Sequence, residues 1–156
     1  MLKRLREERM VRMLTNDELI KMLTTNVKTW NTWRKKEGPE FIDLSYARLS
    51  GENLRGANLR DVDFMSADLD GADLRETDLR SAILTHVNLR GATLEGANLR
   101  GADLSYADFS ETDLTAANLK DTDVDRADFS NAILAYVKID KKTRNAREFD
   151  DANFDI

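Results

Sequence analysis

A large apolar residue recurs at every fifth position over most of this chain. Stepping by five from Leu44 to Ile139 gives twenty positions, and each is Leu, Phe, Val or Ile. Two positions earlier in each unit the residue is usually small, and alanine occupies twelve of the twenty places. An α-helix repeats every 3.6 residues and a strand every two, so neither element explains a period of five. A fixed short period predicts a solenoid of stacked coils.

The repeated unit resembles that of a known family. It is similar to the pentapeptide repeat, written A-(D/N)-L-x-x, and residues 41–140 match it without a break, as in GANLRGADLSYADFS at 96–110. The resemblance implies an all-β solenoid, a right-handed quadrilateral β-helix in which four units form one square coil. The twenty units then give about five coils. Six of the seven glycines lie two positions after the large residue, where a tight corner favours a residue that tolerates positive φ.

The segment before the repeat predicts helices. A solenoid exposes apolar core at each end, so we expect residues 1–40 to form an α-helical N-terminal cap. Asn16, Asp17 and Glu18 predict the start of a helix, and Gly38–Pro39 its end. WNTWRKKEGPE at 30–40 also resembles the lead-in of some cyanobacterial pentapeptide-repeat proteins. The apolar stripe of this one helix is Ile20, Leu23, Val27, Trp30 and Trp33, and Leu2, Leu5 and Leu14 predict a shorter helix before it.

The segment after the repeat, residues 141–156, is interpreted as a C-terminal cap or tail. The register fails after Ile139 and returns weakly at Phe149 and Phe154. We expect residues 141–148 to leave the solenoid and residues 149–156 to fold back over its end.

Residues twenty positions apart stack in one column of a square coil, which converts the sequence into a surface map. One column is a cationic ladder, and it is a candidate site for phosphate or carboxylate groups. The alternative is ordinary solvated charge, paired with the neighbouring Asp61, Asp78 and Asp121. The ladder consists of Arg60, Arg80, Arg100 and Lys120.

A second column carries aromatic residues where most columns carry glycine or polar residues. Exposed apolar and aromatic side chains in one patch are typical of a protein-interaction site. The alternative is that stacked rings simply stabilise the ladder. The column is Tyr46, Ser66, His86, Tyr106 and Arg126, and the candidate interaction face is Met65, Ile83, His86 and Tyr106.

The charge is distributed unevenly. Residues 1–40 carry ten basic and six acidic side chains, a net charge of +4, whereas residues 41–140 carry ten and nineteen, a net charge of -9. The acidic body either faces a basic partner or is offset locally within the fold. Glu52 is the one charged residue at the small inward position, and we expect it to turn toward a basic residue of the N-terminal segment. The acidic columns are Asp43, Asp63, Asp103 and Asp123, and beside them Asp68, Asp108 and Asp128.

The chain lacks the residues that most chemistry requires. It has no cysteine and one histidine, which excludes thiol chemistry and a histidine-rich metal site. It contains no Walker or G-x-G-x-x-G loop, and an interior filled by leucine and alanine leaves no room for a substrate. We therefore expect no enzyme, no cofactor and no metal. Without a signal peptide or an apolar membrane span, we expect the cytoplasm and no membrane partner.

These observations predict a non-enzymatic protein–protein interaction module or regulatory scaffold, monomeric or weakly dimeric, with a protein partner of unknown identity. Direct nucleic-acid binding is disfavoured because the body is acidic. The resemblance supplies an alternative, since quinolone-resistance members of the family resemble duplex DNA and bind gyrase. The Arg60–Lys120 ladder argues against such mimicry, and so does the absence of a dimerising helix in 141–156. A purely structural scaffold is the third reading.

Overall fold

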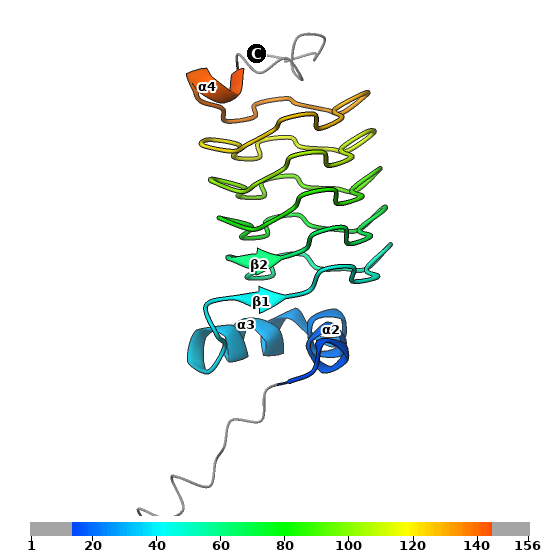
Figure 1. Ribbon diagram of the computed structural model, residues 1–156, viewed down its shortest axis with the longest axis vertical. Coiled ribbons are helices and arrows are strands. Elements are labelled where there is room, and N and C mark those ends of the chain that lie inside the picture. Colours follow the sequence, from blue (N-terminus) through cyan, green and yellow to red (C-terminus); the bar gives the residue numbers. More distant parts are fainter. Residues whose placement is uncertain (1–13, 145–156) are drawn as a thin grey trace, which may run out of the picture.

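The computed structural model describes residues 14–144, and Figure 1 shows a stack of coils with helices at one end. The regular elements alternate with long stretches of turns. They are α2 (Asn16–Thr25), α3 (Val27–Lys36), β1 (Ile42–Asp43), β2 (Val62–Asp63) and α4 (Lys141–Arg144).

The coils pair in parallel with a register of twenty residues. β1 pairs with β2 through Ile42↔Val62 and Asp43↔Asp63. Single parallel bridges continue the same register up to Asn118↔Lys138. Each side of a coil is only five residues long and is bounded by turns, which is why bridges replace the continuous strands expected of an all-β solenoid. At twenty residues per coil, the stretch 41–140 makes five coils.

Every backbone N–H of one repeat donates a hydrogen bond, as residues 77–81 illustrate. Thr77 N–H closes the turn onto Leu74 O, and Asp78 N–H donates to Ala57 O of the preceding coil. Leu79 and Ser81 donate to Asn98 O and Arg100 O of the following coil. The fifth N–H, that of Arg80, has no backbone acceptor and donates to the side chain of Asp78 at 3.3 Å. An aspartate or asparagine at this position therefore completes the hydrogen bonding of its own repeat.

The interior consists of the large residues and the small residues two places before them. The large residues from Leu44 to Leu134 are all buried. Phe109 and Phe129 stack with ring centroids 5.0 Å apart. Threonine is tolerated at the small position because Thr77 and Thr112 donate their hydroxyls to the carbonyls three residues earlier, each at 2.7 Å. The predicted inward pattern is thus the observed core.

Every corner of the coil, two residues after the large one, adopts a positive φ. This holds for the six predicted glycines and equally for aromatic, charged and aliphatic residues, such as Tyr46 at 58° and Ala116 at 58°. The left-handed conformation is costly for a residue with a Cβ. From Tyr46 to Ala116 the N–H at each corner donates to a carbonyl of the next coil, which offsets part of this cost.

The single helix predicted for residues 16–37 is wrong, because the chain forms two helices. Thr15, not Asn16, is the N-cap of α2, and it forms a reciprocal capping box with Glu18. Asn26 then interrupts the helix with an extended conformation and accepts a hydrogen bond from Thr29 N–H. An asparagine that caps the following helix favours a break that the apolar stripe does not reveal.

α3 lies against the fourth side of the first coil and replaces the hydrogen bonds that a preceding coil would supply. The indole N–H of Trp30, which is fully buried, donates to Asn58 O at 2.8 Å. The amide of Asn31 accepts from Asn58 N–H at 2.7 Å and donates to Gly56 O. The guanidinium of Arg34 reaches Arg60 O at 2.5 Å. Side chains of a helix thereby satisfy the backbone edge of the solenoid.

α4 follows the last coil. The buried Thr143 donates its N–H to Asp140 Oδ1 at 2.8 Å, while Asp140 Oδ2 accepts from Asp121 N–H. The chain has left the repeat register at this point, as predicted for residue 141 onward. The predicted return of residues 149–156 and the short helix predicted near Leu2 and Leu5 lie outside the described residues.

Glu52 does not behave as expected within residues 14–144. Its side chain is half-buried, and none of the ion pairs of this part of the chain involves it. Arg34, the cation at the junction of helix and solenoid, donates instead to Pro39 O and Arg60 O. Backbone carbonyls thus occupy this cation, and the basic residues among residues 1–13 lie outside the described part of the chain.

The positive φ at the corners predicts that exchanging glycine for alanine, and alanine for glycine, changes the free energy of unfolding in opposite directions. A Cβ added at Gly56 would have no neighbour within 4 Å, so Gly56→Ala changes only the backbone conformational energy. We expect Gly56→Ala to lower the free energy of unfolding by about 1 kcal/mol and Ala116→Gly to raise it by a similar amount. Urea denaturation measures both, and identical stabilities for the two variants would contradict strain at the corners.

Candidate interaction face

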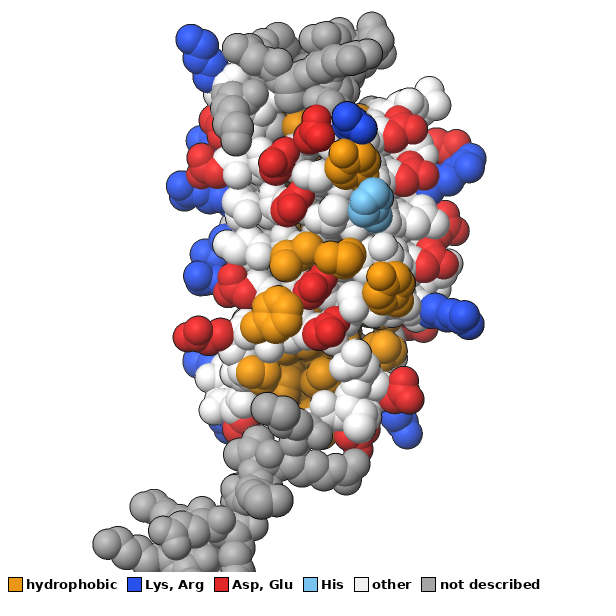
Figure 2. Space-filling model, in the orientation of Figure 1, with side chains coloured by type: hydrophobic (Ala, Val, Ile, Leu, Met, Phe, Trp, Pro, Cys, Tyr) orange, Lys and Arg blue, Asp and Glu red, His pale blue; other side chains and the backbone are white. Residues whose placement is uncertain are grey.

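The first side of the coil is the side whose large inward residues are Leu44, Phe64, Leu84, Leu104 and Val124, and the remaining sides are numbered along the chain from it. Figure 2 shows this side, where orange hydrophobic side chains interrupt red acidic ones and the single histidine lies near the upper part. The predicted face residues Met65, Ile83, His86 and Tyr106 all lie on this side or at its corner.

The corner between the first and second sides forms an aromatic edge, consisting of Tyr46, Ser66, His86, Tyr106 and Arg126. The rings of His86 and Tyr106 stack with centroids 4.8 Å apart and planes 21° apart. The guanidinium of Arg126 lies 5.3 Å from the centroid of the Tyr106 ring. Tyr46 is 70% exposed and Tyr106 is 43% exposed, so the edge presents ring surface to solvent.

Ile83 occupies a position where aspartate or asparagine would complete the backbone hydrogen bonding. On the same column Asp63 accepts from Met65 N–H at 2.8 Å, and Asp103 accepts from Ser105 N–H at 3.0 Å. Ile83 has no acceptor to offer, and Thr85 N–H finds none within the described residues. Ile83 is half-buried and Met65 is 38% exposed. The fold therefore loses a hydrogen bond at Ile83 without gaining a fully buried side chain.

The cationic ladder is largely neutralised. Arg80 makes a bidentate ion pair with Asp78, at 2.7 and 2.6 Å. Arg60 pairs with Asp61 at 3.1 Å, and Arg100 pairs with Asp121 at 2.8 Å. Lys120 makes no ion pair within the described part of the chain. The three partners are those considered in the sequence, which favours solvated and paired charge over an anion site at this ladder.

The aspartates of the first and second sides are not neutralised in this way. Each uses one oxygen to accept the N–H two residues later, as Asp108 does from Ser110 at 2.9 Å. Within residues 14–144 none of them forms an ion pair. These carboxylates are Asp43, Asp63, Asp103 and Asp123 on the first side and Asp68, Asp108 and Asp128 on the second.

Hydrogen bonds stabilise the charged form of several aspartates. The hydroxyl and N–H of Ser45 hold the pKa of Asp43 below its usual value, and Ser130 does the same for the pKa of Asp128. The guanidinium of Arg75 lowers the pKa of Asp73. Burial alone would raise the pKa of Asp103, but the bonds from Ser105 outweigh it and the pKa is lowered.

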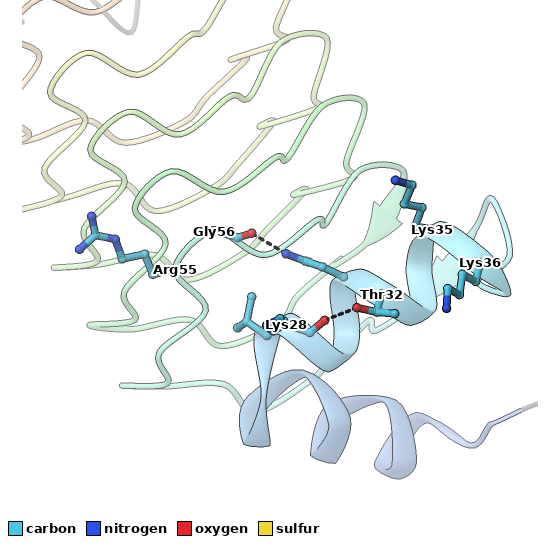
Figure 3. Close-up of a pocket in the computed structure, with 8 residues that line it drawn as sticks. Lys28, Thr32, Lys35, Lys36, Arg55 and Gly56 are labelled. Atoms are coloured by element: carbon cyan, nitrogen blue, oxygen red, sulfur yellow. Dashed lines mark hydrogen bonds between the residues drawn. The ribbon is translucent and has the colours of Figure 1, made fainter.

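A groove of about 700 Å³ lies between α3 and the first coil. Its rim carries Lys28, Lys35, Lys36 and Arg55. Figure 3 shows Lys35 and Lys36 pointing to different sides of α3, while Arg55 points away from the helix. Arg55 binds Glu76 at 2.5 Å. These cations do not converge, so the groove does not form a pocket for a small anion.

Four exposed apolar residues were not predicted as site residues, and Tyr46 of the aromatic column is one of them. Phe41, 56% exposed, lines a second groove with Arg60 and Asp61 at the junction of helix and coil. Ile133 is 53% exposed and Tyr136 is 74% exposed on the last coil. The column map could have found Tyr136, which occupies a corner, and Ile133, which occupies the same place in its repeat as Ile83. Phe41 precedes the first large residue and lies outside the map.

The described residues do not provide a metal site or a membrane span. Within residues 14–144, no group of three or more histidine, aspartate or glutamate side chains is arranged to hold a metal ion. No helix of this part of the chain is long and apolar enough to cross a bilayer.

Comparison with known proteins gives one family. A family model described as pentapeptide repeats matches residues 42–80, 82–121 and 112–141. The crystal structure of alr5209, a pentapeptide repeat protein from Nostoc PCC 7120, has 26% identity and a TM-score of 0.55, and the match covers 78% of this chain and 93% of that one. These matches indicate a right-handed quadrilateral β-helix.

Two further structures match over shorter parts. Rfr23, a pentapeptide repeat protein from the cyanobacterium Cyanothece 51142, has 36% identity over 64% of this chain and 60% of its own, with a TM-score of 0.43. HetL of Nostoc sp. strain PCC 7120, involved in heterocyst differentiation regulation, has 31% identity over 61% and 58%, with a TM-score of 0.28. The chain thus spans about 60% of the length of these two proteins. No curated protein matches it.

The lowered aspartate pKa values predict reduced stability in acid. A folded pKa below the unfolded value gives stability that is present above the unfolded pKa, near about 3.9, and is lost as pH falls through the folded pKa. We expect the free energy of unfolding from urea titrations to fall between about pH 6 and pH 3. Asp73→Asn/Asp103→Asn should flatten this decline, because asparagine keeps the bond to the N–H and does not titrate. A wild-type stability that stays constant over this range would contradict the prediction.

Proposed function

The chain belongs to the pentapeptide-repeat family, and from this premise we propose that it is a non-enzymatic protein-interaction module with a regulatory or scaffolding role. Its contact surface is the first side together with the aromatic edge. Met65 and Ile83 supply apolar contacts, while His86 and Tyr106 supply stacked rings. A solenoid with a filled core and hydrogen-bonded coils holds these groups at fixed spacing, which suits recognition of a partner.

The observation that carries this proposal is Ile83. Aspartate or asparagine at that position would accept the N–H of Thr85 and would remove an aliphatic side chain from the surface. Thr93 and Ile133 also supply no oxygen for this hydrogen bond, so the lost bond alone does not identify a contact. Ile83 differs from them because other exposed apolar and aromatic groups lie beside it. Met65 and the stacked pair of His86 and Tyr106 lie around it on the same side. The combination is an apolar patch bordered by charge, the usual composition of an interface.

Mimicry of DNA remains the second candidate, and one observation favours it. The seven aspartates at the hydrogen-bonding position of the first and second sides form no ion pair within residues 14–144, so two adjacent sides are acidic. On the third and fourth sides, Arg75 and Arg80 neutralise Asp73 and Asp78. A duplex is acidic all round, which makes this candidate weaker. Capture of gyrase that competes with duplex DNA would place it first.

The proposal predicts that Ile83→Asn separates folding from binding. Asparagine restores the hydrogen bond to Thr85 N–H, worth about 0.5–1.5 kcal/mol, and this offsets the smaller apolar area that asparagine buries. We therefore expect the variant to keep a stability within about 1 kcal/mol of wild type. We also expect it to fail to bind a partner that the wild type captures from lysate of the source organism. Mass spectrometry of paired affinity captures measures the difference.

Ile133→Asn is the matched control. Ile133 holds the same position in its repeat and is 53% exposed, but it lies on the third side. Its substitution should leave the captured partner in place. If both variants lose the same proteins, or neither loses any, the first side is not the contact surface.

The aromatic edge gives an independent prediction. Tyr106→Ala removes the ring that stacks on His86, whereas Tyr136→Ala removes a ring at a corner of the same conformation on the opposite edge. We expect Tyr106→Ala to weaken capture of the partner about tenfold or more, as central interface aromatics do, and Tyr136→Ala to leave it unchanged. Quantitative capture over a range of bait concentrations measures both. Equal effects would show that the edge has no special role.

A further inference from the structure

The aromatic edge is bordered on both sides by carboxylates, and this determines the chemistry that can cover it. Asp103 lies on the first side, three residues before Tyr106, and Asp108 lies on the second side, two residues after it. One oxygen of each accepts the N–H and the hydroxyl of a serine, Ser105 or Ser110. Asp123 and Asp128 accept the N–H two residues later in the same way, one coil further along. Carboxylates thus flank the edge on both sides at Ser66, Tyr106 and Arg126, whereas Ile83 and Asn88 flank His86, and Asp43 and Arg48 flank Tyr46.

Among residues 14–144, aspartates without an ion pair are concentrated at this edge. Around the opposite edge, Asp73 pairs with Arg75 at 2.6 Å and Asp78 pairs with Arg80 at 2.6 Å. A cation approaching from solution therefore finds several carboxylates without an ion-pair partner beside Tyr106. On the third and fourth sides two of the three aspartates at the hydrogen-bonding position are neutralised, and Asp113 is the exception within residues 14–144. Electrostatic complementarity selects the partner more than it adds affinity, so this asymmetry defines both the face and the sign of its partner.

The ring surface of the edge already holds a guanidinium. Arg126 of the chain itself lies over Tyr106, with its Cζ atom 5.3 Å from the ring centroid. A guanidinium over a tyrosine face gains cation–π attraction and can still reach carboxylates beside the ring. The face of His86 and the exposed ring of Tyr46 extend the same kind of surface toward the first coil.

The spacing of the coils suits an α-helix lying along the edge. Neighbouring coils are about 4.8 Å apart, and one turn of an α-helix rises about 5.4 Å. The two spacings therefore differ by only about 0.6 Å for each coil passed. Side chains on one face of an extended strand are about 6.7 Å apart and drift by about 1.9 Å per step. A helix can therefore keep one side chain close to each of about three successive coils, over which the drift adds to about 1.2 Å.

We propose that the partner of this edge is an amphipathic α-helix whose apolar stripe packs on Tyr46, His86 and Tyr106 and whose flanking arginine or lysine residues reach the two rows of aspartates. The inference rests on the proposed interaction function and adds the chemical class and shape of the partner. The arginine side chains bind the oxygen atoms that the serine and backbone donors leave available.

The test uses the full chain and three synthetic peptides, with binding followed by fluorescence anisotropy. The first peptide has a leucine stripe at helical spacing flanked by arginines. The second replaces the arginines with glutamates, and the third has the composition of the first in an order without an amphipathic stripe. We expect saturable binding of the first peptide and binding weaker by about tenfold or more for the other two. Equal binding of the glutamate peptide overturns the assigned charge, and equal binding of the reordered peptide overturns the helix.

Two pairs of variants locate the contact. Asp103→Asn/Asp108→Asn removes two charges beside Tyr106, and Asp73→Asn/Asp113→Asn removes two on the third side. Asparagine keeps the backbone hydrogen bond at each position, as Asn98 and Asn118 already do, so all four substitutions preserve the fold. We expect the first pair to weaken binding of the arginine peptide about fivefold or more and the control pair less than about twofold. Equal weakening by the two pairs overturns the proposed edge.

The peptide experiment and the capture experiment test different claims, so a negative result in one can be distinguished from a negative result in the other. If the arginine peptide does not bind while Ile83→Asn still loses a captured protein, the interaction function stands and the partner chemistry proposed here is wrong. If the peptide binds beside Tyr106 while Ile83→Asn and Tyr106→Ala lose no captured protein, the edge has the proposed chemistry and the function proposed for the first side falls.

Discussion

One backbone N–H in each repeat governs the rest of this structure. Four of the five N–H groups find carbonyl acceptors in the turn or in adjacent coils, as Thr77, Asp78, Leu79 and Ser81 show. The fifth, on the residue after the large one, faces outward and is satisfied only when the residue two places earlier supplies an oxygen. Every aspartate and asparagine at that position from Asp43 to Asp128 supplies it. The frequency of aspartate and asparagine at this position is therefore a consequence of the hydrogen bonding of the rod.

This constraint changes how the surface is interpreted. An acidic column at the hydrogen-bonding position needs no partner to explain it, because asparagine and aspartate serve the fold equally well. What carries functional information is the choice between the two, and the departures from both. Asp103 and Asp108 keep a charge that Asn98 and Asn118 show to be dispensable for the fold. Ile83 gives up the hydrogen bond itself. The candidate face is thus defined by choices that the backbone does not require.

The sequence predicted the repeat register, the inward residues and the glycine corners. All three follow from the period of five, which no insertion interrupts between Leu44 and Ile139. The sequence also placed Arg60, Arg80 and Arg100 beside the three aspartates that neutralise them. The sequence prediction was wrong where the preference of one residue for a helix cap competes with a longer apolar stripe. The stripe from Ile20 to Trp33 continues through Asn26 as if one helix ran through, yet the asparagine side chain caps a second helix. Nor could the sequence show that α3 forms hydrogen bonds with backbone groups of the first coil through Trp30, Asn31 and Arg34, because these bonds depend on how the helix packs against the coil.

The division between inside and outside explains why such a rod can acquire a binding face at little cost to its stability. Inward residues are fixed by crowding, and Thr77 enters the core only because its hydroxyl bonds to Leu74 O. Outward residues after the large one and at the corners contribute mainly backbone groups to the stack, so Tyr106 and Gly101 hold equivalent conformations at successive corners. A side chain at a corner can therefore change without disturbing the hydrogen bonds of its coil. The aromatic edge is a selection among side chains that the corner conformation accommodates, and its grouping on one corner beside aspartates that form no ion pair within residues 14–144 distinguishes it from the other three.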